Sequence, residues 1–217
     1  MAAGHSRKHQ GPPLGPGAAA MIGARELASS VQGAFRLAAL HEDGMYFFNH
    51  SQEGFWRSFI AYALVAPGYL LLSWIEPSHV SDSGFPIHDA LVNILAYVIG
   101  CVAFPVAMLP ISRLLERSDR YIGYIIAYNW AAVPQMLLFV TAAVLAQGLS
   151  LGPSVHQTVE LGASLAVLLY YWFIARTALD IGVFAAIGVV VLDGLIAFFI
   201  SSTAAILTTP PPVVPVP

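Results

Sequence analysis

Asp193 is the residue of this chain whose type and position most directly suggest chemistry. It lies in the stretch VVLDGLIAFF, Val190–Phe199, in which no other side chain carries a charge. A carboxylate near the centre of a membrane is costly, so such a residue marks either a function or a buried polar contact. Because no Lys or Arg lies at the same depth, we expect a neutral, hydrogen-bonded acid rather than a salt bridge.

Two interpretations of Asp193 follow, a structural hydrogen bond between helices or a relay for protons or cations. Depth counted along the apolar stretches places Asn129, Gln135 and Tyr170 at a similar level, as possible hydrogen-bond partners in an intramembrane polar cluster. Small residues mark the side on which membrane helices approach closely. Such residues recur at helical spacing around Asp193, namely Ala186, Ala197, Ser201 and Ala204. We therefore expect the carboxylate to face other helices.

Other polar residues lie near the ends of the apolar stretches. Arg176 and Asp180 are four residues apart, so they are expected to pair across one helical turn and to fix a tight connection on the cytoplasmic side. Glu160 lies close to a span end, where water or lipid headgroups reach it. His88 and Asp89, with His79 and Asp82, contain the ligand types of zinc. Their spacing matches no strong metal motif, so we expect no metal site.

The sequence also lacks the parts of common catalytic sites. It contains no G-x-G-x-x-G, P-loop, H-E-x-x-H or G-x-S-x-G motif. The single cysteine, Cys101, lies in an apolar run and is expected to be a buried small side chain. We expect neither enzymatic activity nor a cofactor.

Composition indicates the class of protein that must position these residues. Of 217 residues, 58% are hydrophobic and 10% charged, and the mean hydropathy is +0.73, which is typical of an integral membrane protein. The net charge of -3, without a cluster of Lys and Arg, argues against a nucleic-acid partner.

A membrane helix needs about 20 mainly apolar residues, and the chain contains five such stretches. They are Ser58–Ile75, Asp89–Ile111, Tyr121–Leu149, Thr158–Leu179 and Ile181–Leu207. Prolines inside the first three are expected to kink the helices and adjust their packing. These are Pro67, Pro105, Pro110 and Pro134. The expected fold class is an all-α polytopic bundle with five spans.

Basic residues predict the orientation of the bundle, because Lys and Arg near span ends stay in the cytoplasm. With five spans, all nine positive charges fall on one side. They precede the first span, join the second to the third, or close the fourth. This predicts a cytoplasmic N-terminus and an external C-terminus.

The segments outside the spans have their own character. Residues 1–20 and 208–217 are rich in Pro or Gly and are expected to be a disordered cytoplasmic tail and an external tail. Residues 21–57 form a cytoplasmic or interfacial segment. Within it, Met21–Leu40 is predicted to be an amphipathic helix on the membrane surface. Its apolar positions are Leu27, Val31, Phe35 and Leu37 or Ala38. Asn49 or Ser51 is expected to cap the next helix.

The order of these features resembles bacterial members of the Yip1-like family. The stretches that carry the resemblance are EGFWRSFIAYALVAPGYLLL, YIIAYNWAAVPQMLLFV and YYWFIARTALDIGVFAAIGVV. The resemblance covers roughly residues 53–207 and is one of pattern. It implies five spans, a cytoplasmic N-terminal segment and a non-enzymatic role, and it transfers no catalytic residues.

We therefore expect a multi-pass protein of a bacterial inner membrane that acts as a scaffold or accessory subunit. Its expected partners are membrane lipids and either another membrane protein or further copies of the same chain. The alternative is a small transporter or ion-permeation protein that uses Asp193. A continuous row of polar residues would favour transport, whereas dry packing around Asp193 would favour the scaffold.

Overall fold

The structure is a computed structural model that describes residues 16–75, 86–149 and 152–209. Its α-helices are α1 (Pro16–Ala38), α2 (Gln52–Ser58), α3 (Ile60–Ile75), α4 (Pro86–Leu114), α5 (Tyr121–Gly148), α6 (Pro153–Leu179) and α7 (Val183–Thr208). Two short 3-10 helices complete the described elements, η1 (Glu42–Phe47) and η3 (Ser118–Arg120). No strand occurs within these ranges, so the all-α prediction is confirmed.

Five helical segments are long and apolar enough to cross a membrane. They are Gln52–Leu72, Ile87–Leu114, Ser118–Gly148, Ser154–Leu179 and Val183–Thr208. The helix is the expected form because hydrocarbon offers no partners to backbone N–H and C=O groups, which an α-helix pairs internally. The number of spans is as predicted. The main difference is at the first, where α2 extends the helical segment before α3.

Helix α5 lies at the centre of the bundle. It packs against α3 and α6 along its length, and also contacts α1, α2 and α4. Its residues Tyr124–Ala131 are all buried, without the alternation of a surface helix. Continuous burial shows that protein surrounds this part of α5 on every side. Beyond it, from Leu137, exposed side chains recur.

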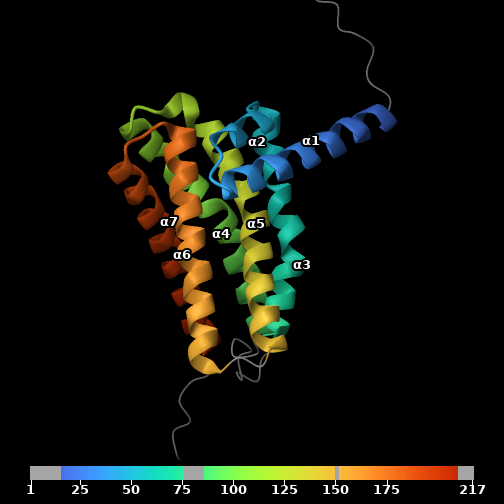
Figure 1. The fold of residues 1–217 in the computed structure, drawn as a ribbon, viewed down its shortest axis with the longest axis vertical. Helices are drawn as coiled ribbons and strands as arrows, with labels where there is room; N and C mark the ends of the chain where they lie inside the picture. Colours follow the sequence, from blue (N-terminus) through green and yellow to red (C-terminus); the bar gives the residue numbers. More distant parts are fainter. Residues whose placement is uncertain (1–15, 76–85, 150–151, 210–217) are drawn as a thin grey trace, which may run out of the picture.

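Helix α1 lies obliquely across one end of the bundle, near α2, and its N-terminal part extends past the bundle (Figure 1). We call this end, which carries α1, η1 and α2, the capped end. Helix α1 contacts η1, α5 and α6. Two glycines meet where α1 crosses η1, since a Cβ on Gly33 would lie 2.8 Å from the Gly44 carbonyl oxygen. The N-terminal segment is therefore packed onto the bundle.

The predicted apolar positions of α1 are only partly packed onto the bundle, since Leu37 is buried and Val31 packs against the core. Ser30, Gly33, Ala34 and Leu37 are its buried residues, whereas Leu27 and Phe35 are 37% and 41% exposed. The helix spans Pro16–Ala38 rather than Met21–Leu40, so it begins within the tail 1–20 that we expect to be disordered, and that expectation is wrong for residues 16–20. Small residues of α1 meet η1, where the two backbones approach closely. The start of α2 was also anticipated, since the Ser51 hydroxyl accepts from the Gly54 N–H at 3.0 Å.

The four prolines lie inside continuous helices, namely Pro67 in α3, Pro105 and Pro110 in α4, and Pro134 in α5. Large apolar side chains cover the outside of the bundle, especially on α4 and α7. Such a surface suits a lipid environment and no aqueous one. Residues 1–15 and 210–217, which make up most of the two predicted tails, lie outside the described residues.

Candidate functional site

Asp193 faces the bundle, as predicted, and its partner is Tyr128 of α5. The Tyr128 hydroxyl donates to Asp193 Oδ1 at 2.7 Å, which joins α7 to the central helix. Ala186 and Val189 are buried on the same side of α7. The expected small-residue stripe is only half correct, because Ala197 and Ser201 are exposed.

The depth of residues along the spans predicts the correct level of α5 for the partner of Asp193, but the wrong side chain. Asn129, the predicted partner, directly follows Tyr128, and neighbouring helical residues point about 100° apart. Tyr128 is therefore directed at α7 when Asn129 is directed at α2 and α3. A hydroxyl on a long aromatic side chain also crosses a helix interface more easily than a short amide. The sequence predicts one tyrosine of a span, Tyr170, as a partner, but not Tyr128, which directly precedes Asn129.

Asn129 holds the opposite side of α5. Its side chain is fully buried, with 0% exposure. The Tyr62 hydroxyl donates to its Oδ1 at 3.0 Å, and its Nδ2 donates to the Ser58 hydroxyl oxygen at 2.8 Å. Ser58 in turn donates to the Phe55 carbonyl. The amide thus joins α2 and α3 to the central helix.

Gln135 and Tyr170 also have partners other than Asp193. The Tyr171 hydroxyl donates to Gln135 Oε1 at 2.6 Å, which joins α6 to α5. The Tyr170 hydroxyl donates to the Ala34 carbonyl at 2.8 Å, which joins α6 to α1. The prediction that these residues bond to Asp193 is wrong. The predicted polar cluster is a set of separate interhelical contacts, of which all but the Tyr170–Ala34 bond involve α5.

Aromatic rings fill the space between these hydrogen bonds. The ring centroids of Phe104 and Tyr128 are 4.4 Å apart, and those of Tyr128 and Tyr171 are 5.2 Å apart. Tyr124 contacts both Phe104 and Tyr128. We call Phe104, Tyr124, Tyr128 and Tyr171 the aromatic cluster. It joins α4, α5 and α6 immediately beside Asp193.

The predicted Arg176–Asp180 pair is not the contact that Asp180 makes. Helix α6 ends at Leu179, and Asp180 has a left-handed backbone, with φ 51° and ψ 55°. Its carboxylate lies 3.2 Å from Arg120 Nη2 instead. Arg176 lies over the Trp172 ring, with its guanidinium carbon 5.5 Å from the centroid. The pair fails because the helix does not continue through Asp180, so the one-turn geometry is absent.

Of the residues considered for metal binding, His88 and Asp89 make a local pair, with His88 Nδ1 3.2 Å from Asp89 Oδ1. Glu160, expected near a span end, lies 3.0 Å from His156 Nε2 through its Oε1. His79 and Asp82 lie outside the described residues. Across residues 16–75, 86–149 and 152–209, no group of three or more His, Cys, Asp and Glu is arranged to hold a metal ion.

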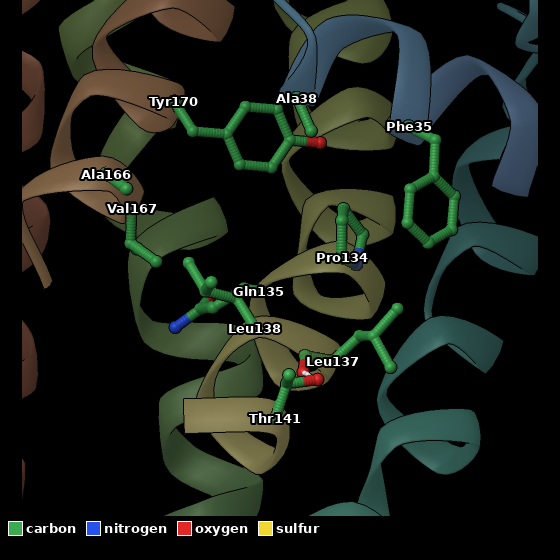
Figure 2. A pocket seen from close by; sticks show the side chains of 10 residues that line it. All are labelled: Phe35, Ala38, Pro134, Gln135, Leu137, Leu138, Thr141, Ala166, Val167 and Tyr170. Carbon is green, nitrogen blue, oxygen red and sulfur yellow. Dashed lines mark hydrogen bonds between the residues drawn. The ribbon is translucent and has the colours of Figure 1, made fainter. Parts of the chain in front are cut away.

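Two hollows open near α1. The first, which we call the groove under α1, has a volume of about 360 Å³ and lies between α1, α5 and α6 (Figure 2). The second, of about 390 Å³, lies between α1, α2 and α5. Glu26 and Arg57, which form an ion pair, both line it. Asp193 lines neither hollow.

The chemistry available to the site follows from this geometry. The Tyr128–Asp193 and Tyr171–Gln135 bonds are joined by the ring contact of Tyr128 with Tyr171, whereas the Tyr62–Asn129 bond lies on the other side of α5. A carboxylate held by one hydroxyl among stacked rings can fix helix positions.

No family model, curated protein or solved structure matches this chain.

Proposed function

We propose that this protein is a non-enzymatic, multi-pass membrane protein that acts as a scaffold or accessory subunit, as the resemblance to Yip1-like proteins implies. One observation carries the proposal. Asp193, the most suggestive residue for activity, is held by Tyr128 beside the aromatic cluster and lines neither hollow. Its carboxylate serves to position α7 against the central helix.

A paired experiment on Asp193 tests this role. Asp193→Asn keeps an oxygen that accepts from Tyr128, so folding and partner binding are retained. Asp193→Leu removes the acceptor and lowers stability by about 1 kcal/mol, the usual scale for an interhelical hydrogen bond in a membrane. The measurements are unfolding of the purified variants in detergent and proton or cation flux in liposomes.

Transport is the competing function, and the same variants distinguish it. An amide cannot exchange a proton in the physiological range. A wild-type flux that disappears in a folded Asp193→Asn variant overturns the scaffold proposal and assigns a relay to Asp193. Equal behaviour of wild type and Asp193→Asn, with a weaker Asp193→Leu variant, supports the scaffold.

The proposed location is a bacterial inner membrane, with the N-terminus in the cytoplasm and the C-terminus outside. The distribution of basic residues supports this orientation. Arg117 and Arg120 contact Asp180, which closely follows Arg176, and the adjacent Tyr121 ring contacts Phe55 of α2 at the capped end. A reporter fused after Arg120 is expected to be cytoplasmic and one fused after Leu207 external. A cytoplasmic signal from the second fusion contradicts the orientation.

A further inference from the structure

The second hollow, of about 390 Å³, lies where the first candidate span begins. That span starts at Gln52, and Arg57 of α2 and Ile60 of α3 line the hollow a short distance along it. The remaining walls come mainly from α1 and from Ile126 and Trp130, which lie in the N-terminal half of α5. The hollow therefore lies at the capped end of the bundle and not at its middle.

Charged side chains define the depth of the hollow. Glu26 and Arg57 form an ion pair in its lining, and the Arg57 side chain is 40% exposed. A second carboxylate, Glu53, pairs with Arg57 from outside the lining and is 67% exposed. Exposed charges of this kind lie where water or lipid headgroups reach them, because a charge in hydrocarbon is costly. The mouth of the hollow is therefore at headgroup level in the leaflet at the capped end.

The base of the hollow lies only slightly deeper than this mouth. Asn129 Nδ2 donates to the Ser58 hydroxyl oxygen at 2.8 Å, so these two residues are at the same level. Ser58 directly follows Arg57, and Asn129 directly precedes Trp130. Trp130 is therefore within about one helical turn, ~5.4 Å, of the depth of Arg57. The ester groups of a phospholipid lie at this depth, between its phosphate and the hydrocarbon.

Two polar groups in the lining have no protein partner. Ser30 of α1 is 2% exposed and Trp130 is 4% exposed. Neither the Ser30 hydroxyl nor the Trp130 Nε1–H bonds to another group of the described residues. Every fully enclosed side-chain N and O atom of these residues has a partner, so both groups touch accessible space. A nearly buried donor without an acceptor is costly, so the hollow favours an occupant that brings acceptors to its base.

The mouth of the hollow favours a particular headgroup. One guanidinium, that of Arg57, faces the carboxylates of Glu26 and Glu53, so the three groups together carry an excess of one negative charge. This excess repels an anionic headgroup. A zwitterionic headgroup fits better, because its phosphate lies at the guanidinium and its ammonium at the carboxylates.

An apolar path leads from the hollow to the lipid. Ile60 lines the hollow and is 51% exposed, and Leu64, one turn further along α3, is 47% exposed. Leu27 of α1 lines the hollow as well and is 37% exposed. An acyl chain that leaves the hollow along α3 remains on apolar side chains.

We propose that the second hollow binds one zwitterionic phospholipid with an ammonium headgroup. Its ester carbonyls accept from the Trp130 Nε1–H and the Ser30 hydroxyl, its phosphate lies beside Arg57, and one acyl chain lies along α3. The site goes beyond the proposed scaffold function. It does not involve Asp193, so it stands equally if the protein is a transporter.

The test uses the full-length protein, purified in detergent and stripped of lipid, with bound lipids counted by native mass spectrometry. Three probes are titrated, namely dioleoylphosphatidylethanolamine, its ether-linked analogue without ester carbonyls, and the anionic dioleoylphosphatidylglycerol. The wild type is expected to bind one molecule of the first probe saturably. It binds the ether analogue about three- to tenfold more weakly for each hydrogen bond lost. It binds the anionic lipid about two- to fivefold more weakly, the range of partly exposed ion pairs.

Two variants remove single polar groups of the hollow. Trp130→Phe removes the indole N–H but keeps an aromatic ring, so the preference for ester over ether lipid falls about three- to tenfold. Trp56→Phe is its matched control, because Trp56 is 67% exposed and lies outside the lining, and it retains the preference. Glu26→Gln removes one carboxylate and reduces the discrimination against the anionic lipid. Asp43→Asn, which changes the Arg36–Asp43 pair outside the lining, leaves this discrimination unchanged.

A third variant fills the hollow. Ala24 is an exposed residue of α1 that lines it, so Ala24→Trp occupies the space without burying a new side chain in the core, and saturable binding is lost. Ala39→Trp, at an exposed position outside the lining, binds like wild type. Thermal unfolding of each variant in detergent verifies its folding.

Any of four results overturns the proposal. They are the absence of saturable binding of the first probe to the wild type, which leaves the hollow to water, equal wild-type affinities for ester and ether lipids, equal wild-type affinities for the zwitterionic and anionic lipids, and unchanged binding by a folded Ala24→Trp variant. A dimer of the lipid-free protein that Ala24→Trp dissociates assigns the hollow to a second copy of the chain and also overturns the proposal.

Discussion

Asn129 provides the sharpest test of how the bundle is held together. Its amide is fully buried and bonds to Tyr62 at 3.0 Å and to Ser58 at 2.8 Å. Replacing it by Leu preserves the approximate volume but removes both bonds and leaves the Tyr62 hydroxyl without its acceptor. The two bonds tie α2 and α3 to α5, so their loss is expected to loosen the first span from the centre of the bundle.

The expected magnitude follows from measured interhelical hydrogen bonds. In membrane proteins these average about 0.6 kcal/mol and reach about 1.7 kcal/mol. Two bonds therefore predict a loss of about 1–3 kcal/mol for Asn129→Leu. Tyr62→Phe removes one of them and is expected to cost about 0.6–1.7 kcal/mol. Because the two residues share that bond, the double variant is less destabilised than the sum of the single ones.

The assay is reversible unfolding in mixed micelles, with the free energy of unfolding measured for wild type, both single variants and the double variant. The coupling energy of the Asn129–Tyr62 pair is the quantity of interest. Thr141→Val is the control paired with Asn129→Leu, since the Thr141 hydroxyl bonds within α5. The destabilisation by Thr141→Val is expected to add to that by Asn129→Leu without coupling. A coupling below about 0.3 kcal/mol, the scatter of independent sites, refutes the reasoning that this bond joins the helices.

Two further predictions concern the capped end. Gly33→Ala is expected to lower the free energy of unfolding by about 1–3 kcal/mol, because the added methyl group is overpacked against the Gly44 carbonyl. The control is Gly23→Ala, which has no atom within 4 Å of the added Cβ and is expected to be neutral or stabilising. Equal unfolding midpoints of the two variants contradict the Gly33–Gly44 contact. The Arg36 hydrogen bond lowers the pKa of Asp43 below its ordinary value of 3.8. The contribution of the Arg36–Asp43 pair to folding stability is therefore complete above pH 3.8 and is lost as the pH falls through the lowered pKa. Amide exchange in η1 should therefore increase over that range in wild type but not in Asp43→Asn, and an identical pH profile in both argues against the pair.

The sequence predicted less of the polar contacts than of the helices. Every residue proposed for the intramembrane cluster does form an interhelical or buried hydrogen bond, because a polar group in an apolar span needs a partner. The partners were not predictable. Tyr62, Tyr128 and Tyr171 supply them, and their hydroxyls lie at the end of large apolar rings that periodicity classifies as packing residues.

The connection between α6 and α7 shows a second limit. A four-residue spacing predicts an ion pair only while the helix continues, and α6 ends before Asp180. No proline or glycine lies between Arg176 and Asp180 to predict the end of the helix, although Gly182 follows closely. The carboxylate turns instead to Arg120, which is 60 residues earlier in the chain. Only the packing of η3 beside this turn brings them together.

The sequence by itself determined the class, the number of long apolar helices and their approximate bounds. This was possible because length and apolarity are local properties, and a chain in hydrocarbon has to satisfy its backbone within each helix. Tertiary structure decided the rest. Which side of each helix faces which neighbour depends on rotation and close approach, such as the contact of Gly33 with Gly44, which sets the side of α1 that packs against η1. A rotation of about 100° separates one residue from the next, and it directs Tyr128 rather than Asn129 to Asp193.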